Sequence, residues 1–401
     1  MLKNINLVLL IGILFSIYMM QGFLYPSGSI ISQGILLVIL AIGGMCFIGT
    51  LLHKNIPAPA IVFTLFFLML LLTYVASPKI QYGWKHEAIG AVATFGQFKN
   101  ACAFSLLFFI GYYTEIRQNV NQKIITTVFV ILLVVAVIMF FHSKSRLLLE
   151  LDREGVTVNA AYKFVVLIPF LPLVMNCLKN KYVRIGIVAS MMSLIIMGSK
   201  RGAILCMLAS SVFILYYYLH HTRLSVKKII AVLFVVLLGC AFLFYSIEQN
   251  EYLTGRLEKM EKSGIGTRNI AYSELWKHWY SESSNFAYLF GNGSAASIGV
   301  WGNYAHNDWL ELLTDNGLLG VVMYMSMFFS FFLLIYRSLL SPDFKLSMYL
   351  CLLIWFLQTF FSMGYTDVGN GVYTLLLGIL TGKDITVQNE IDYNHEDIVV
   401  D

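Results

Sequence analysis

His306 is the residue of this sequence best placed for acid–base chemistry. It lies in a polar, glycine-rich stretch, GNGSAASIGVWGNYAHNDWLELLTDNGLLG from Gly291 to Gly320, which leads into a long apolar run. We expect a short helix to begin at His306 and to run to about Asp315, so that unpaired backbone N–H groups and the positive end of the helix dipole disfavour an imidazolium. A neutral imidazole can act as a general base. The alternative is a histidine that only hydrogen-bonds a neighbouring loop.

Two adjacent cations lie in the turn MGSKRGAIL, from Met197 to Leu205. The turn interrupts an apolar run, and cations kept at a membrane boundary indicate an anionic ligand. Arg201 is the stronger candidate, because a planar guanidinium can hold two phosphate oxygens whereas the ammonium of Lys200 acts as a point charge. The alternative is a cation that extends its side chain to lipid head groups.

A second pair of cations lies in the large polar loop that precedes His306. Thr267 is a plausible N-cap, and Arg268 lies one helical turn before Tyr272. The pattern then predicts one apolar and aromatic helix face made by Tyr272, Leu275, Trp276 and Trp279. We expect Arg268 to point from this face into a membrane-proximal cavity. Arg256, in LTGRLEKM, is a further candidate for anion binding, although a solvated face is favoured for it.

Supporting roles are predicted for four residues, Asn307, Glu311, Trp276 and Trp279. Glu311 and Asp315 are one helical turn apart, but His306 shares a face with Trp309 and not with Glu311. We therefore interpret Glu311 as the partner of a loop cation in preference to a second catalytic acid.

The composition is that of a polytopic membrane protein. Hydrophobic residues make up 58% and charged residues 12% of 401 positions, which excludes an ordinary soluble domain. All six cysteines fall inside apolar runs, so neither a loop disulfide nor a spaced metal site is indicated. The net charge of +5 is spread among loops without a Lys/Arg-rich run, which argues against nucleic acid as a partner.

Apolar runs predict an all-α fold with about twelve transmembrane helices. They lie near 5–24, 30–52, 58–76, 90–113, 124–141, 160–178, 185–198, 203–219, 229–246, 317–340, 346–363 and 371–382. The first run lacks a small-residue cleavage site and is interpreted as a retained span. The chain then divides into an N-terminal bundle (1–246), a large loop (247–316), C-terminal helices (317–382) and a disordered acidic tail (383–401).

Charge in the short loops predicts cytoplasmic termini and an extracytoplasmic large loop. The extracytoplasmic side nevertheless retains cations, which indicate an anionic ligand unless nearby carboxylates pair with them: Lys79, Lys85, Lys99, Lys144, Arg146, Arg153, Lys163, Lys200 and Arg201. Five tryptophans are assigned to this side and either stack on sugar rings or form an interfacial belt: Trp84, Trp276, Trp279, Trp301 and Trp309.

One histidine and several arginines at a single membrane face, without metal-ligand spacing, suit a metal-independent attack on a phosphate-activated substrate. Arginine would neutralise a diphosphate leaving group as its charge develops. Histidine would accept the proton of the attacking hydroxyl. No cofactor is expected.

The sequence resembles the bacterial O-antigen ligase and O-antigen polymerase superfamily. The resemblance rests on GSKRGAIL, on TRNIAYSELW leading into LFGNGSAASIG, and on HNDWLELLTDNGLLGVV, in the order found in the family. It covers residues 180–324 in detail and the rest of the chain only as a hydrophobic pattern.

This resemblance implies a GT-C type glycosyltransferase of the inner (cytoplasmic) membrane that uses an undecaprenyl-diphosphate-linked glycan on its periplasmic face. The diphosphate-binding arginines of the family would correspond to Arg201 and Arg268, and its essential histidine to His306. Lys200 departs from the common pattern, which leaves open which cation faces the phosphates. The acceptor would be a glycan, as in polymerases, lipid A-core, as in ligases of lipopolysaccharide biosynthesis, or a protein, as in O-oligosaccharyltransferases.

Two other functional classes remain open at the level of the sequence. About twelve spans with cytoplasmic ends also suit a transporter or a flippase of lipid-linked glycan, although no repeat symmetry is visible and the polar residues gather at one face. A non-catalytic scaffold for polysaccharide chains would keep the tryptophans but would not need His306.

Overall fold

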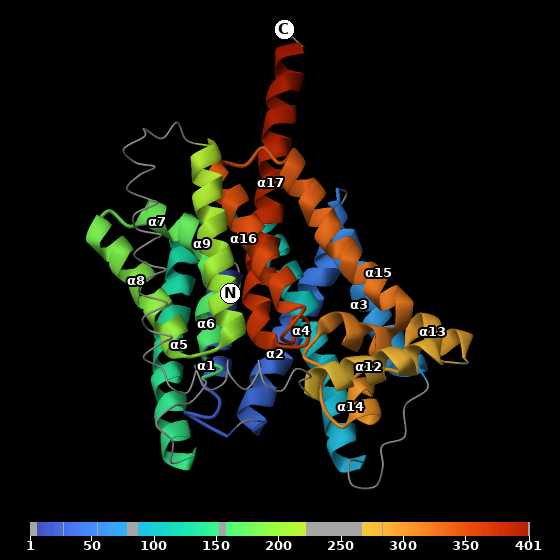
Figure 1. Cartoon of the computed structure of the whole chain (residues 1–401). Coiled ribbons are helices and arrows are strands. Elements are labelled where there is room, and N and C mark those ends of the chain that lie inside the picture. Colours follow the sequence, from blue (N-terminus) through green and yellow to red (C-terminus); the bar gives the residue numbers. More distant parts are fainter. Residues whose placement is uncertain are drawn as a thin grey trace.

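The computed structural model describes residues 6–26, 28–53, 55–77, 87–151, 158–221, 267–282 and 284–399, and within these ranges it is built of helices without strands (Figure 1). Five helices are long and apolar enough to cross a membrane: α2 (Ile30–Leu51), α3 (Ala58–Ala76), α5 (Gln122–Leu151), α9 (Arg201–His221) and α15 (Asp308–Arg337). The architecture is consistent with a multi-pass helical membrane protein.

The remaining helices include the central pair of the bundle and the short helices at one of its ends. They are α1 (Leu7–Met19), α4 (Glu87–Gln118), α6 (Ala161–Val165), η2 (Ile168–Phe170), α7 (Leu171–Cys177), α8 (Lys181–Met197), α12 (Thr267–Tyr280), α13 (Asn285–Phe290), α14 (Ala296–Trp301), α16 (Pro342–Gln358), η3 (Val368–Asn370) and α17 (Gly371–Val399). Every span predicted from the sequence overlaps one of these helices except 229–246, which lies outside the described residues.

The centre of the bundle is the close packing of α4 against α17. A Cβ added to Gly111 would lie 2.2 Å from the carbonyl oxygen of Leu375, and one added to Gly378 would lie 2.1 Å from that of Phe108. Only glycine allows the two backbones to approach this closely, which is a common way for helices to pack inside a membrane. α4 also packs against α2 and α3.

Helix α15 changes direction at Gly317, where φ is 64° and ψ is −164°. A side chain there would also collide with the backbone of Leu289, only 2.4 Å away. The break separates a polar first part, residues 308–316, from residues 318–337, which are about 30 Å long at the rise of an α-helix and match the thickness of a hydrocarbon core. The sequence predicted such a short helix before an apolar run.

The short helix begins two residues later than predicted. Asn307 is the N-cap, and its side-chain oxygen accepts a hydrogen bond from the backbone N–H of Leu310 at 3.2 Å. His306 therefore precedes the helix, because the amide side chain of Asn307 satisfies the N–H groups of the first turn.

The C-terminal tail differs from the sequence prediction. A disordered segment was predicted from residue 383, whereas α17 continues as a helix to Val399 (Figure 1). No glycine or proline follows Gly382, and the amide of Gln388 donates to Asp384 one turn earlier at 2.9 Å, so nothing in this segment breaks the helix.

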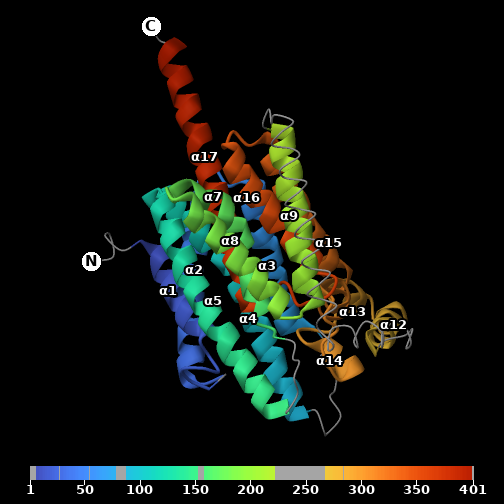
Figure 2. The same ribbon diagram turned by 60° about the vertical axis from the view of Figure 1, so that its left-hand side comes forward.

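The two ends of the bundle have different contents. At one end, here called the loop end, lie α12, α13, α14 and the first part of α15 (Figure 1). At the opposite end, the tail end, α17 extends beyond the neighbouring helices. Figure 2, turned by 60°, keeps α12–α14 at the end away from the C-terminus.

Candidate functional site

His306 lies at the loop end in a constrained backbone turn. Its φ is 53°, in the left-handed region that a residue with a side chain adopts only when its surroundings hold it there. The carboxylate of Glu311 supplies this hold, because its Oε1 accepts a hydrogen bond from the His306 backbone N–H at 3.1 Å. Glu311 thus fixes the turn that carries the imidazole.

Glu311 belongs to a buried network that reaches across the bundle. Nε2 of Gln97, on α4, donates to Glu311 Oε2 at 3.4 Å and to Asp315 Oδ2 at 2.9 Å. Both carboxylates are buried. The sequence predicted a loop cation as the partner of Glu311, whereas within the described ranges the structure holds its carboxylate with N–H groups.

Asp315 in turn holds the glycine-rich loop against α15. Its carboxylate accepts from the backbone N–H groups of Ala295 at 3.0 Å and Ser297 at 3.2 Å. Gly291 lies where the loop meets this helix, and a Cβ there would be 2.3 Å from the backbone N of Asn316. The glycine and the carboxylate together allow the loop to lie flat on the helix that follows His306.

Asp308 anchors the start of α15 to the segment that follows α16. Its buried carboxylate accepts from the backbone N–H of Gly364 at 2.8 Å and from the hydroxyl of Tyr324 at 2.6 Å. Its own N–H donates to the carbonyl oxygen of Thr359 at 2.8 Å. The two residues before it, His306 and Asn307, are therefore attached to a rigid part of the bundle.

Two cations act on the imidazole of His306. Partial burial lowers the pKa of His306 below its ordinary value, and the positive charges of Arg268 and Lys200 lower it further. The structure therefore brings together three segments far apart in the sequence: the turn before α9, the start of α12 and the turn before α15. A neutral imidazole is favoured at neutral pH.

The exposed Arg268 interacts electrostatically with two tyrosine hydroxyls, those of Tyr272 and Tyr162. Tyr272 hydrogen-bonds Asn307, and burial raises the pKa of the Tyr272 hydroxyl while the charge of Arg268 opposes that shift in part. Arg268 also interacts electrostatically with Tyr162 on α6, and the Tyr162 hydroxyl lies so close to Gly202 that a Cβ there would be only 2.2 Å from it. These contacts tie α12 to the beginning of α9.

The two adjacent cations of the turn before α9 differ in burial. Arg201 begins α9 with an exposed side chain, whereas its neighbour Lys200 is half-buried and interacts with the imidazole. Arg256 lies outside the described residues. Lys200, the residue at which the chain departs from the common family pattern, therefore acts on the imidazole of His306.

The two predicted tryptophans differ in their surroundings. Trp279 is 8% exposed, stacks on Tyr288 with ring centroids 4.5 Å apart and donates from its indole N–H to the Tyr288 carbonyl oxygen at 3.2 Å. It packs α12 against α13. Trp276 is 51% exposed and is the member of this pair that a ligand can reach.

Sequence reasoning missed Gln97 and Asp308. A lone glutamine within an apolar run was the available signal for Gln97, since polar residues inside spans are kept for a purpose. Asp308 gave no signal, because its partners Thr359 and Gly364 lie at and after the end of α16, and only folding brings them to Asp308. In the part of the chain that the structure describes, no three His, Cys, Asp or Glu side chains are arranged to hold a metal ion.

Comparison with known proteins adds no relative. No family model matches the chain, and neither does any curated protein. The site itself offers an imidazole of lowered pKa, two nearby cations, and buried carboxylates that hold the loops.

Proposed function

We propose that this protein is a GT-C type membrane glycosyltransferase with about twelve spans that transfers an undecaprenyl-diphosphate-linked glycan to a hydroxyl acceptor. The observation that carries the proposal is the half-buried imidazole of His306 at one end of an apolar bundle, where burial and the charges of Arg268 and Lys200 lower its pKa. The resemblance of the three motifs to O-antigen ligases and polymerases supports the same reaction. The acceptor is a glycan or lipid A-core.

In this reaction the acceptor oxygen attacks the anomeric carbon of the glycan. His306 accepts the proton of the hydroxyl as the new C–O bond forms, while the bond between the anomeric carbon and the diphosphate oxygen breaks. The departing undecaprenyl diphosphate takes the electron pair and gains one negative charge. Arg268, Lys200 and Arg201 stabilise that charge.

The same cations serve the base and the leaving group. Before the donor binds, their positive charge disfavours an imidazolium and keeps His306 unprotonated. A bound diphosphate offsets this positive charge, so the imidazole becomes a stronger base when both substrates are present. The carboxylates of Glu311 and Asp308 hold the turn in place throughout.

The proposed orientation follows the short-loop charges. The loop end faces the periplasm and the tail end faces the cytoplasm, with the protein in the inner membrane. A donor lipid then reaches the site from the outer leaflet of this membrane, while its diphosphate meets Arg268.

The test uses purified full-length protein in lipid nanodiscs with an undecaprenyl-diphosphate-linked glycan. Separate reactions offer lipid A-core, a second lipid-linked repeat, or a serine-containing peptide, so the product also identifies the acceptor. We expect glycan transfer with release of undecaprenyl diphosphate. If proteoliposomes instead move the intact donor across the bilayer without releasing undecaprenyl diphosphate, the protein is a transporter and the proposal is wrong.

A further inference from the structure

A cavity at the tail end lies far from His306 and is independent of the proposed transfer reaction. It has a volume of about 310 Å³ and lies between the α4–α5 turn, the start of α16 and the middle of α17. Its lining contains one cation, Lys383, and the amide side chains of Asn119, Asn121 and Gln122. The apolar part of the lining is made by Val120, Ile125 and Phe344.

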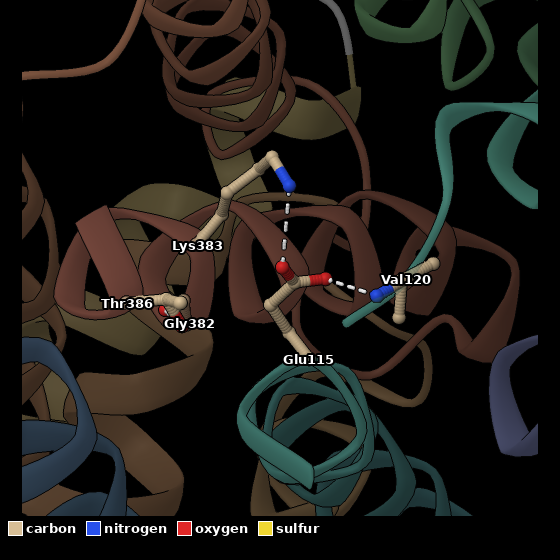
Figure 3. A network of polar contacts seen from close by, with 5 residues as sticks. All are labelled: Glu115, Val120, Gly382, Lys383 and Thr386. Carbon is tan, nitrogen blue, oxygen red and sulfur yellow. Dashed lines mark hydrogen bonds and ion pairs between the residues drawn. The ribbon is translucent and has the colours of Figure 1, made fainter. Parts of the chain in front are cut away.

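Lys383 is the charged group of this cavity. Its ammonium lies 3.4 Å from Glu115 Oε1, and the Glu115 side chain is fully buried whereas that of Lys383 is 27% exposed (Figure 3). The other carboxylate oxygen of Glu115 accepts from the Val120 N–H at 2.8 Å. The ammonium also lies 5.8 Å from the centroid of the Phe344 ring. It has three donors, and its 3.4 Å distance to Glu115 is longer than the usual 2.7–2.9 Å of a charge-assisted hydrogen bond, so these two contacts do not saturate it.

The amides beside Lys383 add hydrogen-bonding capacity. The Asn121 side-chain oxygen accepts from the Lys123 N–H at 2.9 Å, which leaves its NH₂ group as a donor. The Gln122 amide donates to the Leu173 carbonyl oxygen at 2.7 Å. The lining therefore presents a cation and an amide donor next to the apolar Ile125 and Phe344, a combination that suits a phosphate group carrying an apolar substituent.

The position of the cavity agrees with a lipid phosphate. Helix α16 runs from beside the cavity at Phe344 to the loop end at Gln358, and its 17 residues rise about 25 Å, close to the thickness of a hydrocarbon core. The cavity is thus near the level of lipid head groups. Further cations lie in the chain close to the lining, among them Arg117 and Lys123.

We propose that this cavity binds the phosphate of an anionic glycerophosphate head group, one without a cationic substituent, with Lys383 as its cationic partner and the amide of Asn121 as a further donor. Basic pockets between transmembrane helices at a membrane face bind anionic lipids in this way. The same phosphate chemistry is offered by an anionic phospholipid and by soluble glycerol 3-phosphate, which the experiment separates.

The experiment measures lipid retention by native mass spectrometry of the full-length protein. Because Lys383→Gln alone would leave the buried Glu115 carboxylate without its partner, the test variant is Glu115→Gln combined with Lys383→Gln, which keeps an amide pair without charge. Lys345→Gln is the matched control, since it removes a cation next to Phe344 but outside the lining.

We expect the wild type and Lys345→Gln to retain phosphatidylglycerol in preference to phosphatidylcholine, and the double variant to bind it about tenfold more weakly, as for a lost charge-assisted hydrogen bond. Competition by glycerol 3-phosphate at a similar concentration would support the site and identify the soluble ligand as its occupant. A double variant with the full preference for phosphatidylglycerol would overturn the proposal. So would a wild type that retains both lipids equally and binds no glycerol 3-phosphate.

Discussion

The two ends of the bundle differ in what their cations act on, although neutral donors hold buried carboxylates at both. At the tail end, Asp384 accepts from the Ser338 hydroxyl and the Leu339 N–H, while Glu115 lies opposite a cation, Lys383, in an ion pair. At the loop end, Glu311 and Asp315 are held by backbone N–H groups and by the amide of Gln97, while the nearby cations Arg268 and Lys200 act on the imidazole of His306.

This difference shows that some charged groups of the fold only stabilise one another, whereas others act on a titratable side chain. A buried ion pair mainly compensates its own desolvation. At the loop end, neutral donors hold the carboxylates in place, and cationic charge is directed at a titratable group instead. Cations and a titratable group with a shifted pKa, kept together at the end of an apolar bundle, indicate a substrate site.

Arg268→Ala should have the largest effect among the cations. In the proposed mechanism this guanidinium contacts the diphosphate in both ground and transition states, so donor affinity and transfer should both fall, by roughly 10- to 100-fold on the scale of a lost charged hydrogen bond. Arg268→Lys should restore part of the loss, because it keeps the charge but not the two-pronged grip. Donor titration and single-turnover transfer measure the two effects. Equal transfer rates for the wild type and Arg268→Ala would show that Arg268 has no role in the reaction.

Glu311→Ala should slow turnover by roughly tenfold while leaving donor affinity unchanged, because it releases the turn that orients His306 without touching the diphosphate. The comparison is between kcat and donor Kd for the purified variant. Glu274→Ala, an exposed carboxylate on α12, is the control. If Glu311→Ala weakens donor binding and leaves kcat intact, Glu311 does not position the base.

Lys200→Gln should change the pH dependence more than the maximal rate. The positive charge of Lys200 helps to hold the pKa of His306 below its ordinary value, so its removal raises that pKa and favours the imidazolium. Transfer requires the neutral base, so the acidic limb of the kcat/KM profile should move to higher pH. Lys277→Gln, elsewhere on α12, should leave the limb in place. A limb that stays fixed or moves to lower pH in Lys200→Gln would contradict the role of Lys200.

Chelation should have the smallest effect. Since Arg268 and Lys200 can neutralise the leaving group, transfer should be unchanged in excess EDTA. Loss of turnover that magnesium or manganese restores would show that a divalent ion takes part in the charge neutralisation.

The sequence allowed prediction of those features that depend on local patterns. Apolar runs located the helices, and the change from polar to apolar residues after Asp315 matches the break at Gly317 that ends the short helix. Because Asn307 is the N-cap, that helix begins at Asp308, two residues after the predicted start. Boundaries of this kind are the least certain part of a prediction from sequence.

The supporting contacts of the site were beyond the reach of local patterns. Gln97 meets Glu311 and Asp315 across sequence separations of 214 and 218 residues, which no spacing rule connects. The same holds for Lys200 beside His306, where the sequence favoured Arg201 because of the geometry of its guanidinium. Arg256 stays a prediction.

The most direct test of the account compares donor affinity with single-turnover transfer in His306→Ala, with His220→Ala as the control. His220 is an exposed histidine near the tail end of α9, so its loss should affect neither quantity. For His306→Ala we predict nearly wild-type affinity for the lipid-linked donor and a transfer rate lower by about 10²- to 10⁴-fold, the usual effect of removing a general base. Transfer at the wild-type rate would show that His306 is structural and would contradict the proposed mechanism.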